Sequence, residues 1–514
     1  MTPSNYLFEL IKSLSKNERR FFKLYSSFHV GDKNYLKLFD VISMQEKYDE
    51  KNVKEEFRQD KKFLRSFPRW KQYLYQMILK SLRNYHAENT ANIALSNAII
   101  ETEILFDKGL YKHTSKLLAK AKHLALAHEK FPFYLTLSEY DREQMVHSLS
   151  PKLHSRLLAE SYTKAKRAIK KYEHNIGYYE LSSQLFGLFR QHGYIRDANF
   201  QSASKAIMKN PMLKDERKAE TYAAKNIYYR MHALYGSMTG YWEENLHYYQ
   251  KQVSLIESHP VMIRDNARAY VNALGNLCNV SDLLNKKNIF REALHKMRNI
   301  RTSSPGLKNF VFRQSYILEL ESYCTWGNFE KALKLVPEIT KAIDSGGIKL
   351  EKFHIQNLHY CIAYSYFGAG NYKESLKWLN KVANDQDDTD VRLDTHVMTR
   401  MFGLILHYEL GNEQYLEYDV KSTERFLKKK NQYYNLETIL IRSIGKIFTK
   451  AKNTAERKII FMELKKELLK LAKDPVNKAA FDAWDFLSWV ESKIQNRRFA
   501  YIVRDKARAR IKKR

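Results

Sequence analysis

The sequence predicts an all-α protein, in which antiparallel helix pairs follow one another as an α-solenoid with a helical cap at each end. Three observations support this fold class. The 514 residues include only 17 Gly and 9 Pro, which is a poor supply for the many turns of an all-β protein. Leu, Lys, Glu and Ala, which are good helix formers, dominate long stretches. A glycine turn between two helical patterns recurs, and such self-similarity is typical of helical repeats.

The recurring turn is clearest in "YFGAGNYKESLKWLNKV" (366–382), where Gly370 separates two stretches of helical periodicity. A helix ends at least cost with a residue that adopts the left-handed conformation, and glycine and asparagine do so most easily. We place comparable turns at Gly109, Gly193, Gly240, Asn288, Gly327, Gly370 and Gly411. From Gly193 onward the spacings are 47, 48, 39, 43 and 41 residues, and 84 residues separate Gly109 from Gly193. We therefore expect an irregular period of about 40 residues.

Two side-chain positions accompany these turns. A bulky residue lies two positions after the turn, at Tyr111, Ile195, Trp242, Phe290, Phe329 and Tyr372. A small residue lies five positions after it, at Thr114, Ala198, Ala293, Ala332 and Ser375, where it lets two helices approach closely. The pattern resembles the tetratricopeptide (TPR) repeat, and the best match is Ala363, Tyr366, Gly370, Tyr372, Ser375, Leu379 and Val382. Asn245 and Leu416 depart at the small position, Glu413 departs at the aromatic one, and the period exceeds the TPR value of about 34.

Three further segments resemble a family of uncharacterised bacterial TPR-like proteins. They are "LHYELGNEQYLEYDVKSTERFLKKK" (406–430), "SLSKNERRFFKLYSS" and "KNYLKLFDVI". The resemblance implies a cytoplasmic helical-repeat protein and brings no particular activity. The predicted domains are an N-terminal helical cap (1–88), a TPR-like solenoid (89–430), a C-terminal helical cap (431–496) and a basic tail (497–514).

The N-terminal segment lacks the turn pattern. Ser15 and Glu18 in "SKNE" form a capping-box pattern that predicts the start of a helix. Basic and aromatic residues then interleave over 60–86, which is compatible with a nucleic-acid surface. The alternative is an amphipathic helix whose core-facing residues are Trp70, Leu74, Ile78 and Leu82. Their steps of four favour this alternative.

The charge is strongly positive, with a formal net charge of +31. A field of this sign attracts polyanions. Residues 497–514, "RRFAYIVRDKARARIKKR", carry nine basic residues and one acid. The segment is either a short basic helix that binds RNA, anionic lipid or an acidic protein face, or a frayed, solvated terminus. Its candidate polyanion-binding residues are Arg497, Arg498, Arg504, Lys506, Arg508, Arg510, Lys512, Lys513 and Arg514.

No motif of catalytic chemistry stands out. The chain contains no GxxxxGK[ST] loop, no GxGxxG after a strand, no HExxH and no GxSxG. Cys278, Cys324 and Cys361 are far apart among apolar residues, which is typical of buried thiols in a reducing compartment. No run of about 18 apolar residues occurs. We expect no catalytic residue, no cofactor, no metal, no integral membrane association, and a cytoplasmic location.

The TPR resemblance implies a concave groove that is lined by the first helix of each pair and binds peptides. It places this groove at Arg190, Arg230, Gln314, Glu321, Asn357, Tyr360 and Tyr364. We expect a non-enzymatic scaffold or adaptor that binds an acidic protein or peptide there. The alternative is an RNA- or ribosome-associated protein that uses the basic surface and the tail. A third class is an enzyme, or a regulator switched by a small ligand. The identity of the partner and the oligomeric state stay open.

Overall fold

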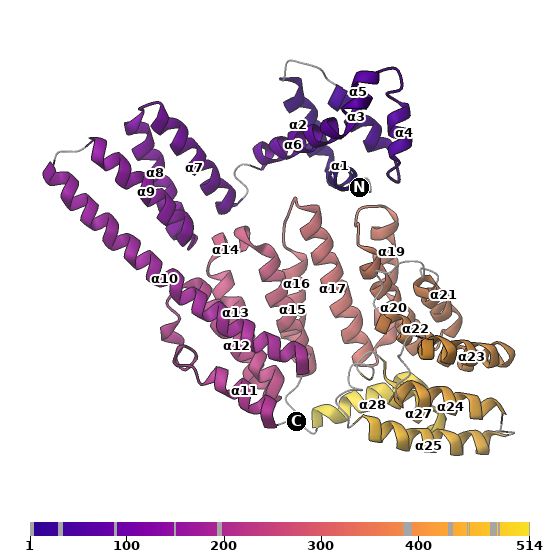
Figure 1. The fold of residues 1–514 in the computed structure, drawn as a ribbon. Helices are drawn as coiled ribbons and strands as arrows, with labels where there is room; N and C mark the ends of the chain where they lie inside the picture. The colour runs from indigo at the N-terminus through magenta and orange to yellow at the C-terminus, as the bar shows by residue number, and fades with distance from the viewer. Residues whose placement is uncertain are drawn as a thin grey trace. The chain divides into compact units, whose positions relative to one another are not determined.

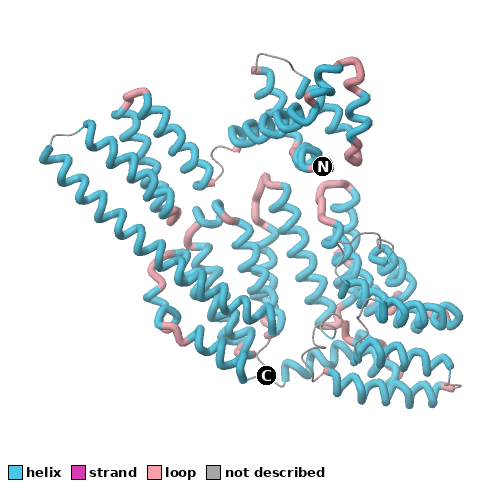
Figure 2. Tube along the Cα trace, viewed as in Figure 1, coloured by secondary structure: helices cyan, strands magenta, loops and turns pink. Residues whose placement is uncertain are grey.

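A computed structural model describes residues 5–28, 34–86, 90–148, 151–192, 198–383, 393–429, 435–449, 451, 453–472, 481 and 484–512. Helices form the regular structure of these residues, and no strand occurs among them (Figure 2). The predicted all-α class is therefore confirmed for the described part of the chain.

The chain divides into two compact units. Unit 1 comprises Met1–Tyr179, Ala219–Ala224 and Pro260–Asp265, and unit 2 comprises Glu180–Lys218, Lys225–His259 and Asn266–Arg514. The boundary between the units falls inside α10 (Pro151–His192), which is one continuous helix (Figure 1). The sequence therefore has no linker at this boundary. The domain bounds expected at residues 88, 430 and 496 stay predictions.

Unit 1 begins with two groups of helices, each around its own core. The first group is α1 (Tyr6–Ser13), α2 (Lys16–Ser27), α3 (Asn34–Met44), α4 (Glu50–Glu55), α5 (Lys61–Arg65) and α6 (Phe67–Tyr85). The second is α7 (Ala91–Asp107), α8 (Tyr111–Ala127), α9 (Phe131–Ser148) and the part of α10 around Ala168. The short α14 (Pro260–Asp265) also belongs to unit 1.

The local predictions for the first group are confirmed. The Glu18 backbone N–H donates to Ser15 Oγ at 3.3 Å, and the Ser15 N–H donates to Glu18 Oε2 at 2.7 Å, which completes the capping box of α2. In α6, Leu74 and Ile78 are fully buried, while Trp70 and Leu82 pack against the same core. The amphipathic interpretation of this basic, aromatic stretch is therefore correct.

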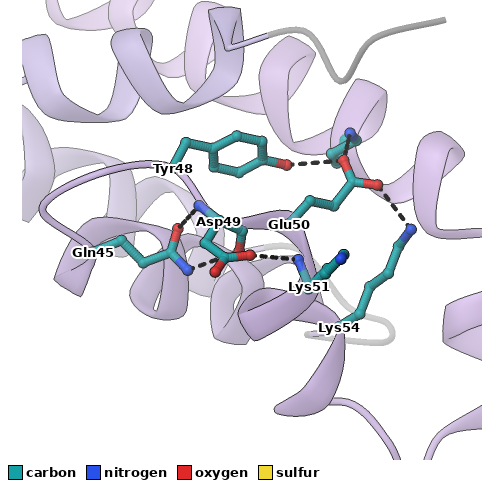
Figure 3. A network of polar contacts seen from close by, with 7 residues as sticks. Gln45, Tyr48, Asp49, Glu50, Lys51 and Lys54 are labelled. Atoms are coloured by element: carbon teal, nitrogen blue, oxygen red, sulfur yellow. Dashed lines mark hydrogen bonds and ion pairs between the residues drawn. The ribbon is translucent and has the colours of Figure 1, made fainter.

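A network of polar contacts joins α4 to α6 (Figure 3). The Asp49 carboxylate accepts from the N–H of Lys51 at 2.9 Å and so caps α4. Glu50 pairs with Lys54 Nζ at 2.8 Å and with Lys71 Nζ of α6 at 2.6 Å, and it accepts from the Tyr48 hydroxyl at 3.2 Å. Burial alone would raise the pKa of Glu50, but the hydrogen bonds and charges of the two lysines outweigh it and lower the pKa to about 2.

Glu50→Gln is expected to destabilise the packing of α4 on α6 by about 1–2 kcal/mol at pH 7. The folded-state pKa lies below the usual value of 4.5, so the stabilisation is present above about 4.5 and is lost as the pH falls toward 2. The difference between wild type and variant should shrink over that window. Hydrogen exchange of peptides from α4 and α6 measures it locally.

Glu55→Gln is the matched control for this substitution. Glu55 pairs with Arg58 at 3.2 Å, but both side chains are largely exposed. An exposed pair contributes little, so exchange in α4 should change by less than about 0.5 kcal/mol. An equal effect of the two substitutions would contradict the role assigned to Glu50.

Unit 2 contains the remaining helices. They are α11 (Ala198–Met208), α12 (Tyr222–Thr239, whose first residues belong to unit 1), α13 (Trp242–Glu257), α15 (Ala267–Leu283), α16 (Lys287–Arg298), α17 (Pro305–Thr325), α18 (Phe329–Leu333), α19 (Val336–Asp344), α20 (Lys352–Gly368), α21 (Tyr372–Ala383), α22 (Leu393–Glu409), α23 (Glu413–Lys429), α24 (Asn435–Thr449), α25 (Thr454–Leu471), α27 (Phe486–Gln495) and α28 (Phe499–Lys512). Consecutive helices pack as neighbouring pairs, notably α15 with α16, α20 with α21, α22 with α23, and α24 with α25.

The turns between paired helices follow the predicted pattern at five glycines. Gly109, Gly240, Gly327, Gly370 and Gly411 all have φ between 67° and 83°, the left-handed region that favours glycine. In each case the next helix begins two residues later. Gly193 lies outside the described residues.

The predicted turn at Asn288 is wrong. Asn288 lies inside α16, and the left-handed residue is Asn285, with φ 57°, two residues before the helix begins at Lys287. The turns from Gly240 to Gly411 are then 45, 42, 43 and 41 residues apart, more regular than the sequence pattern indicated. The error arose because two asparagines lie three residues apart, and Phe290 fitted the bulky position after the wrong one.

The core of unit 2 contains a cluster of aromatic rings. Phe367 of α20 lies 5.5 Å from Phe402 of α22, 5.4 Å from Trp484 and 5.2 Å from Phe499 of α28, between ring centroids. The Phe329 ring is 5.8 Å from that of Phe499. The last helix of the chain therefore contributes to the same core as helices more than one hundred residues earlier.

Candidate functional site

Four of the predicted groove residues meet two residues of the basic tail at one cavity of unit 2. The cavity has a volume of about 700 Å³ and is bordered by α17, α20, α27 and α28. We call it the C-terminal recess and define it by Glu321, Asn357, Tyr360, Tyr364, Lys506 and Arg510. Sequence reasoning placed these residues in two separate candidate sites.

The helical period explains why α20 presents several polar groups to the recess. Asn357, Tyr360 and Tyr364 occupy positions i, i+3 and i+7, so they share one face of the helix. The opposite face carries Leu358 and Ile362, which are fully buried in the core. On α17, Glu321 and Cys324 are likewise three residues apart and both line the recess.

Glu321 is accessible to water, yet protein surrounds it inside the recess. Partial loss of hydration, and secondarily the charge of Asp282, raise the pKa of the Glu321 carboxyl above its usual range. The carboxylate of Asp485, which also lines the recess, is already used as the N-cap of α27. It accepts from the Ser488 N–H at 2.9 Å and from Ser488 Oγ at 2.5 Å. Glu321 is thus the acidic group of the recess that is free to meet a ligand.

The two cationic side chains of the recess, Lys506 and Arg510, come from α28, and they differ in whether they form an ion pair. Lys506 Nζ is paired with Glu491 at 2.9 Å, and Glu491 is also paired with Lys465 at 2.9 Å. Among the residues that the structure describes, Arg510 has no ion-pair or hydrogen-bond partner, and its side chain is exposed. Arg510 also lines a smaller neighbouring cavity of about 210 Å³ beside Asp282 and Trp326. The guanidinium of Arg510 is therefore available to an anionic group.

The remaining groups of the recess include a buried hydroxyl and two buried thiols. The Tyr360 hydroxyl is buried and has no hydrogen-bond partner within the described structure. Burial raises the pKa of the Cys324 thiol to about 12 and that of Cys361 well above its usual value, so both thiols are poor nucleophiles. An incoming acceptor could satisfy Tyr360, and a donor could satisfy Glu321.

The basic segment is helical from Phe499 to Lys512, which agrees with the short helix that one of the two sequence interpretations predicts. Phe499, Ile502, Val503 and Ala507 are buried. Arg504 Nη2 donates to the Gly327 carbonyl at 2.9 Å, and Arg497 pairs with Asp505 at 2.8 Å. Arg498 and Arg508 are exposed, while the side chains of Lys512, Lys513 and Arg514 lie outside the described residues. Polyanion binding by this segment stays a prediction.

The other predicted groove residues do not reach the C-terminal recess. Gln314 lies on α17 with its Nε2 atom 3.2 Å from where a Cβ on Gly275 of α15 would lie, so it packs between two helices. Arg230 lines a separate cavity of about 640 Å³. Arg190 is in α10, and its side chain lies outside the described residues.

Sequence reasoning missed Asn276 and Asn279, which line the second cavity. Their spacing of three on a helix that begins after Asn266 could have indicated a polar face. It also missed Asp485, whose position before "FLSW" is typical of an N-cap.

Fold and site together define an all-helical protein of neighbouring helix pairs with a polar recess. No family model, curated protein or solved structure matches the chain. Within the described ranges, no helix combines the length and apolar character needed to cross a membrane. The TPR-like identity therefore stays a prediction that the helix pairs support.

Proposed function

We propose that the chain is a non-enzymatic scaffold or adaptor, whose helix pairs form a TPR-like solenoid and whose C-terminal recess holds a segment of a protein partner. The observation that carries this proposal is the meeting of four groove residues with Lys506 and Arg510 at one cavity. A cavity of about 700 Å³ accommodates a few side chains of a peptide.

The chemistry of the recess supports an acidic segment. Arg510 has an unoccupied guanidinium among the described residues, and the net charge of +31 attracts negatively charged partners. Asn357 and Tyr360 supply neutral donors, which suit carbonyl or carboxylate oxygens. The raised pKa of Glu321 weakens the repulsion that this carboxyl would otherwise exert on an acidic ligand.

Arg510→Glu is expected to weaken partner binding at least about tenfold, because it places a negative charge where the acidic group binds. The test uses the full chain in its native cell, with a photo-reactive phenylalanine in place of Asn357. Proteins crosslinked at this position are identified by mass spectrometry. The main adduct should disappear in the Arg510→Glu background.

Arg508→Glu provides the matched control. Arg508 is exposed on the same helix and does not line the recess, so the substitution changes the net charge equally. The adduct should survive in this variant. If no protein is crosslinked at position 357, or if Arg508→Glu removes the adduct as Arg510→Glu does, the recess is not the partner site.

The alternative function is binding of RNA or the ribosome, which the exposed Arg498 and Arg508 on α28 favour. Arg508→Glu, together with Arg498→Glu, distinguishes RNA binding from protein binding. In an RNA titration over a salt series, each phosphate contact that is lost should reduce the salt slope by about 1. RNA binding that weakens with Arg498→Glu and Arg508→Glu, together with no protein adduct at position 357, would replace the first proposal by the second.

A further inference from the structure

The second cavity of unit 2 lies where α10, α12, α13 and α15 meet, and has a volume of about 640 Å³. This is within the range of about 300–1,000 Å³ that small-molecule sites occupy. We call it the Arg230 recess, because Arg230 is the charged residue among those described that line it. Apolar residues such as Met231, Leu234 and Val280 form much of the wall.

Asn245 gives this recess an unsatisfied polar group. Its side chain is 1% exposed, and its Nδ2 donates to Ser237 Oγ. The Ser237 hydroxyl donates to the Ala233 carbonyl at 3.2 Å and accepts from Asn245 Nδ2, and it is also hydrogen-bonded to Tyr249. Asn245 Oδ1 is then a buried acceptor with no partner in the described structure. Such an acceptor favours a ligand with an N–H donor.

The sequence pattern makes Asn245 unusual. It occupies the position five residues after the Gly240 turn, where Thr114, Ala332 and Ser375 stand after other turns. Those three residues are buried and small, and they serve close packing of helices. Asn245 is accommodated by close packing on Gly236, and its buried oxygen costs stability unless a partner satisfies it.

Arg230 supplies the complementary charge. Its side chain is exposed, and Nη2 donates to Ser182 Oγ of α10 at 2.8 Å. This bond orients the guanidinium and leaves its other N–H groups for an anion. Because the other described lining residues are uncharged, an anion in the recess would meet no opposing carboxylate.

Aromatic side chains line the same cavity. Trp242 is partly buried at the start of α13, and Phe186 of α10 is 51% exposed, with Phe189 nearby on the same helix. An exposed phenylalanine at the mouth of a cavity and a tryptophan in its wall provide flat surfaces for stacking. The cavity thus offers flat aromatic surfaces together with the Asn245 acceptor and the Arg230 cation.

We propose that the Arg230 recess binds a small aromatic anion that carries an N–H donor on its ring system. The anionic group pairs with Arg230, the N–H donates to Asn245 Oδ1, and the ring stacks on the aromatic wall. Two sources share this chemistry: a nucleoside monophosphate and an indole carboxylate. This site is separate from the C-terminal recess, and the inference does not depend on the function proposed above.

The test measures binding to the full chain by isothermal titration calorimetry with two pairs of probes. Adenosine 5′-monophosphate is compared with adenosine, and indole-3-acetate with indole. At least one anion should bind about tenfold or more tightly than its neutral counterpart. Arg230→Gln should remove this difference, and Asn245→Ala should weaken both members of the pair by a similar factor.

Arg291→Gln is the control, because Arg291 is exposed on α16 and does not line the recess. It should leave both affinities unchanged. Binding of the monophosphate alone, or of the carboxylate alone, assigns the source. The proposal is overturned if neither anion binds more tightly than its neutral counterpart, or if Arg291→Gln acts as Arg230→Gln does. Circular dichroism shows whether each variant is folded.

Discussion

Gly368→Ala is expected to destabilise unit 2 by roughly 2–4 kcal/mol. A Cβ on Gly368 would lie 2.1–2.3 Å from three carbons of the Phe329 ring, far inside van der Waals contact. The ring cannot turn away, because Phe329 is 2% exposed and lies against Phe499 and Tyr364. The better helix propensity of alanine, about 1 kcal/mol, offsets only part of this cost. The unfolding transition followed by tryptophan fluorescence measures the effect, because Trp484 and Trp489 are in the same core.

Alanine substitutions at two other glycines serve as controls, because they separate the cost of steric overlap from the effect of alanine on the backbone conformation. At Gly187 in α10 nothing lies within 4 Å of an added Cβ, so Gly187→Ala should stabilise by up to about 1 kcal/mol. Gly370 also has free space but a φ of 82°, so Gly370→Ala should cost about 1 kcal/mol from strain alone. If Gly368→Ala behaved like either of them, the close packing of Phe329 on α20 would be refuted.

Ending the chain at Asn496 is expected to cost about 4 kcal/mol or more in the stability of unit 2. The deletion removes the buried side chains of Phe499, Ile502 and Val503. It also removes the bond from Arg504 to the Gly327 carbonyl. The aromatic cluster around Trp484 would become exposed, and urea unfolding should show a lower midpoint and a red-shifted tryptophan emission.

The control for this deletion is a variant that keeps α28 and removes positive charges of the basic segment. Arg498→Gln combined with Arg508→Gln changes two exposed side chains, and stability should change by less than about 0.5 kcal/mol. A truncated chain that unfolds at the wild-type midpoint would show that α28 is not part of the core. The deletion is accordingly a poor probe of polyanion binding, whereas substitutions at the exposed arginines leave the fold intact.

The local rules of helix pairing could be derived from the sequence. Glycine turns at five positions, the capping box at Ser15 and the buried face of α6 each depend on residues close together in the chain. Short-range steric and hydrogen-bonding preferences determine such features, and they leave a direct pattern. The turn at Asn285 was missed because two equivalent asparagines compete for it.

The candidate sites were harder to predict because they depend on long-range packing. The groove residues were correctly grouped in part, since Asn357, Tyr360 and Tyr364 share one face of α20. Their meeting with Arg510 depends on how α28 folds back, which no local pattern encodes. The apolar residues 499, 502, 503 and 507 do have helical spacing, which is typical of a helix with one buried face. The many arginines and lysines around them instead favoured the interpretation as an exposed polyanion-binding segment.

The close fit of α28 on the turn at Gly327 sets an order of events during synthesis. A Cβ at Gly327 would lie 2.9 Å from the Ala500 carbonyl oxygen and 3.0 Å from the Arg504 nitrogen, so backbone meets backbone there. Residue 499 is translated 172 residues after residue 327, which at about 5–20 residues per second is a delay on the order of 10–30 s. Until Phe499 is made, the aromatic surface that grows from Phe329 through Phe367 to Trp484 lacks the ring that covers it in the folded protein.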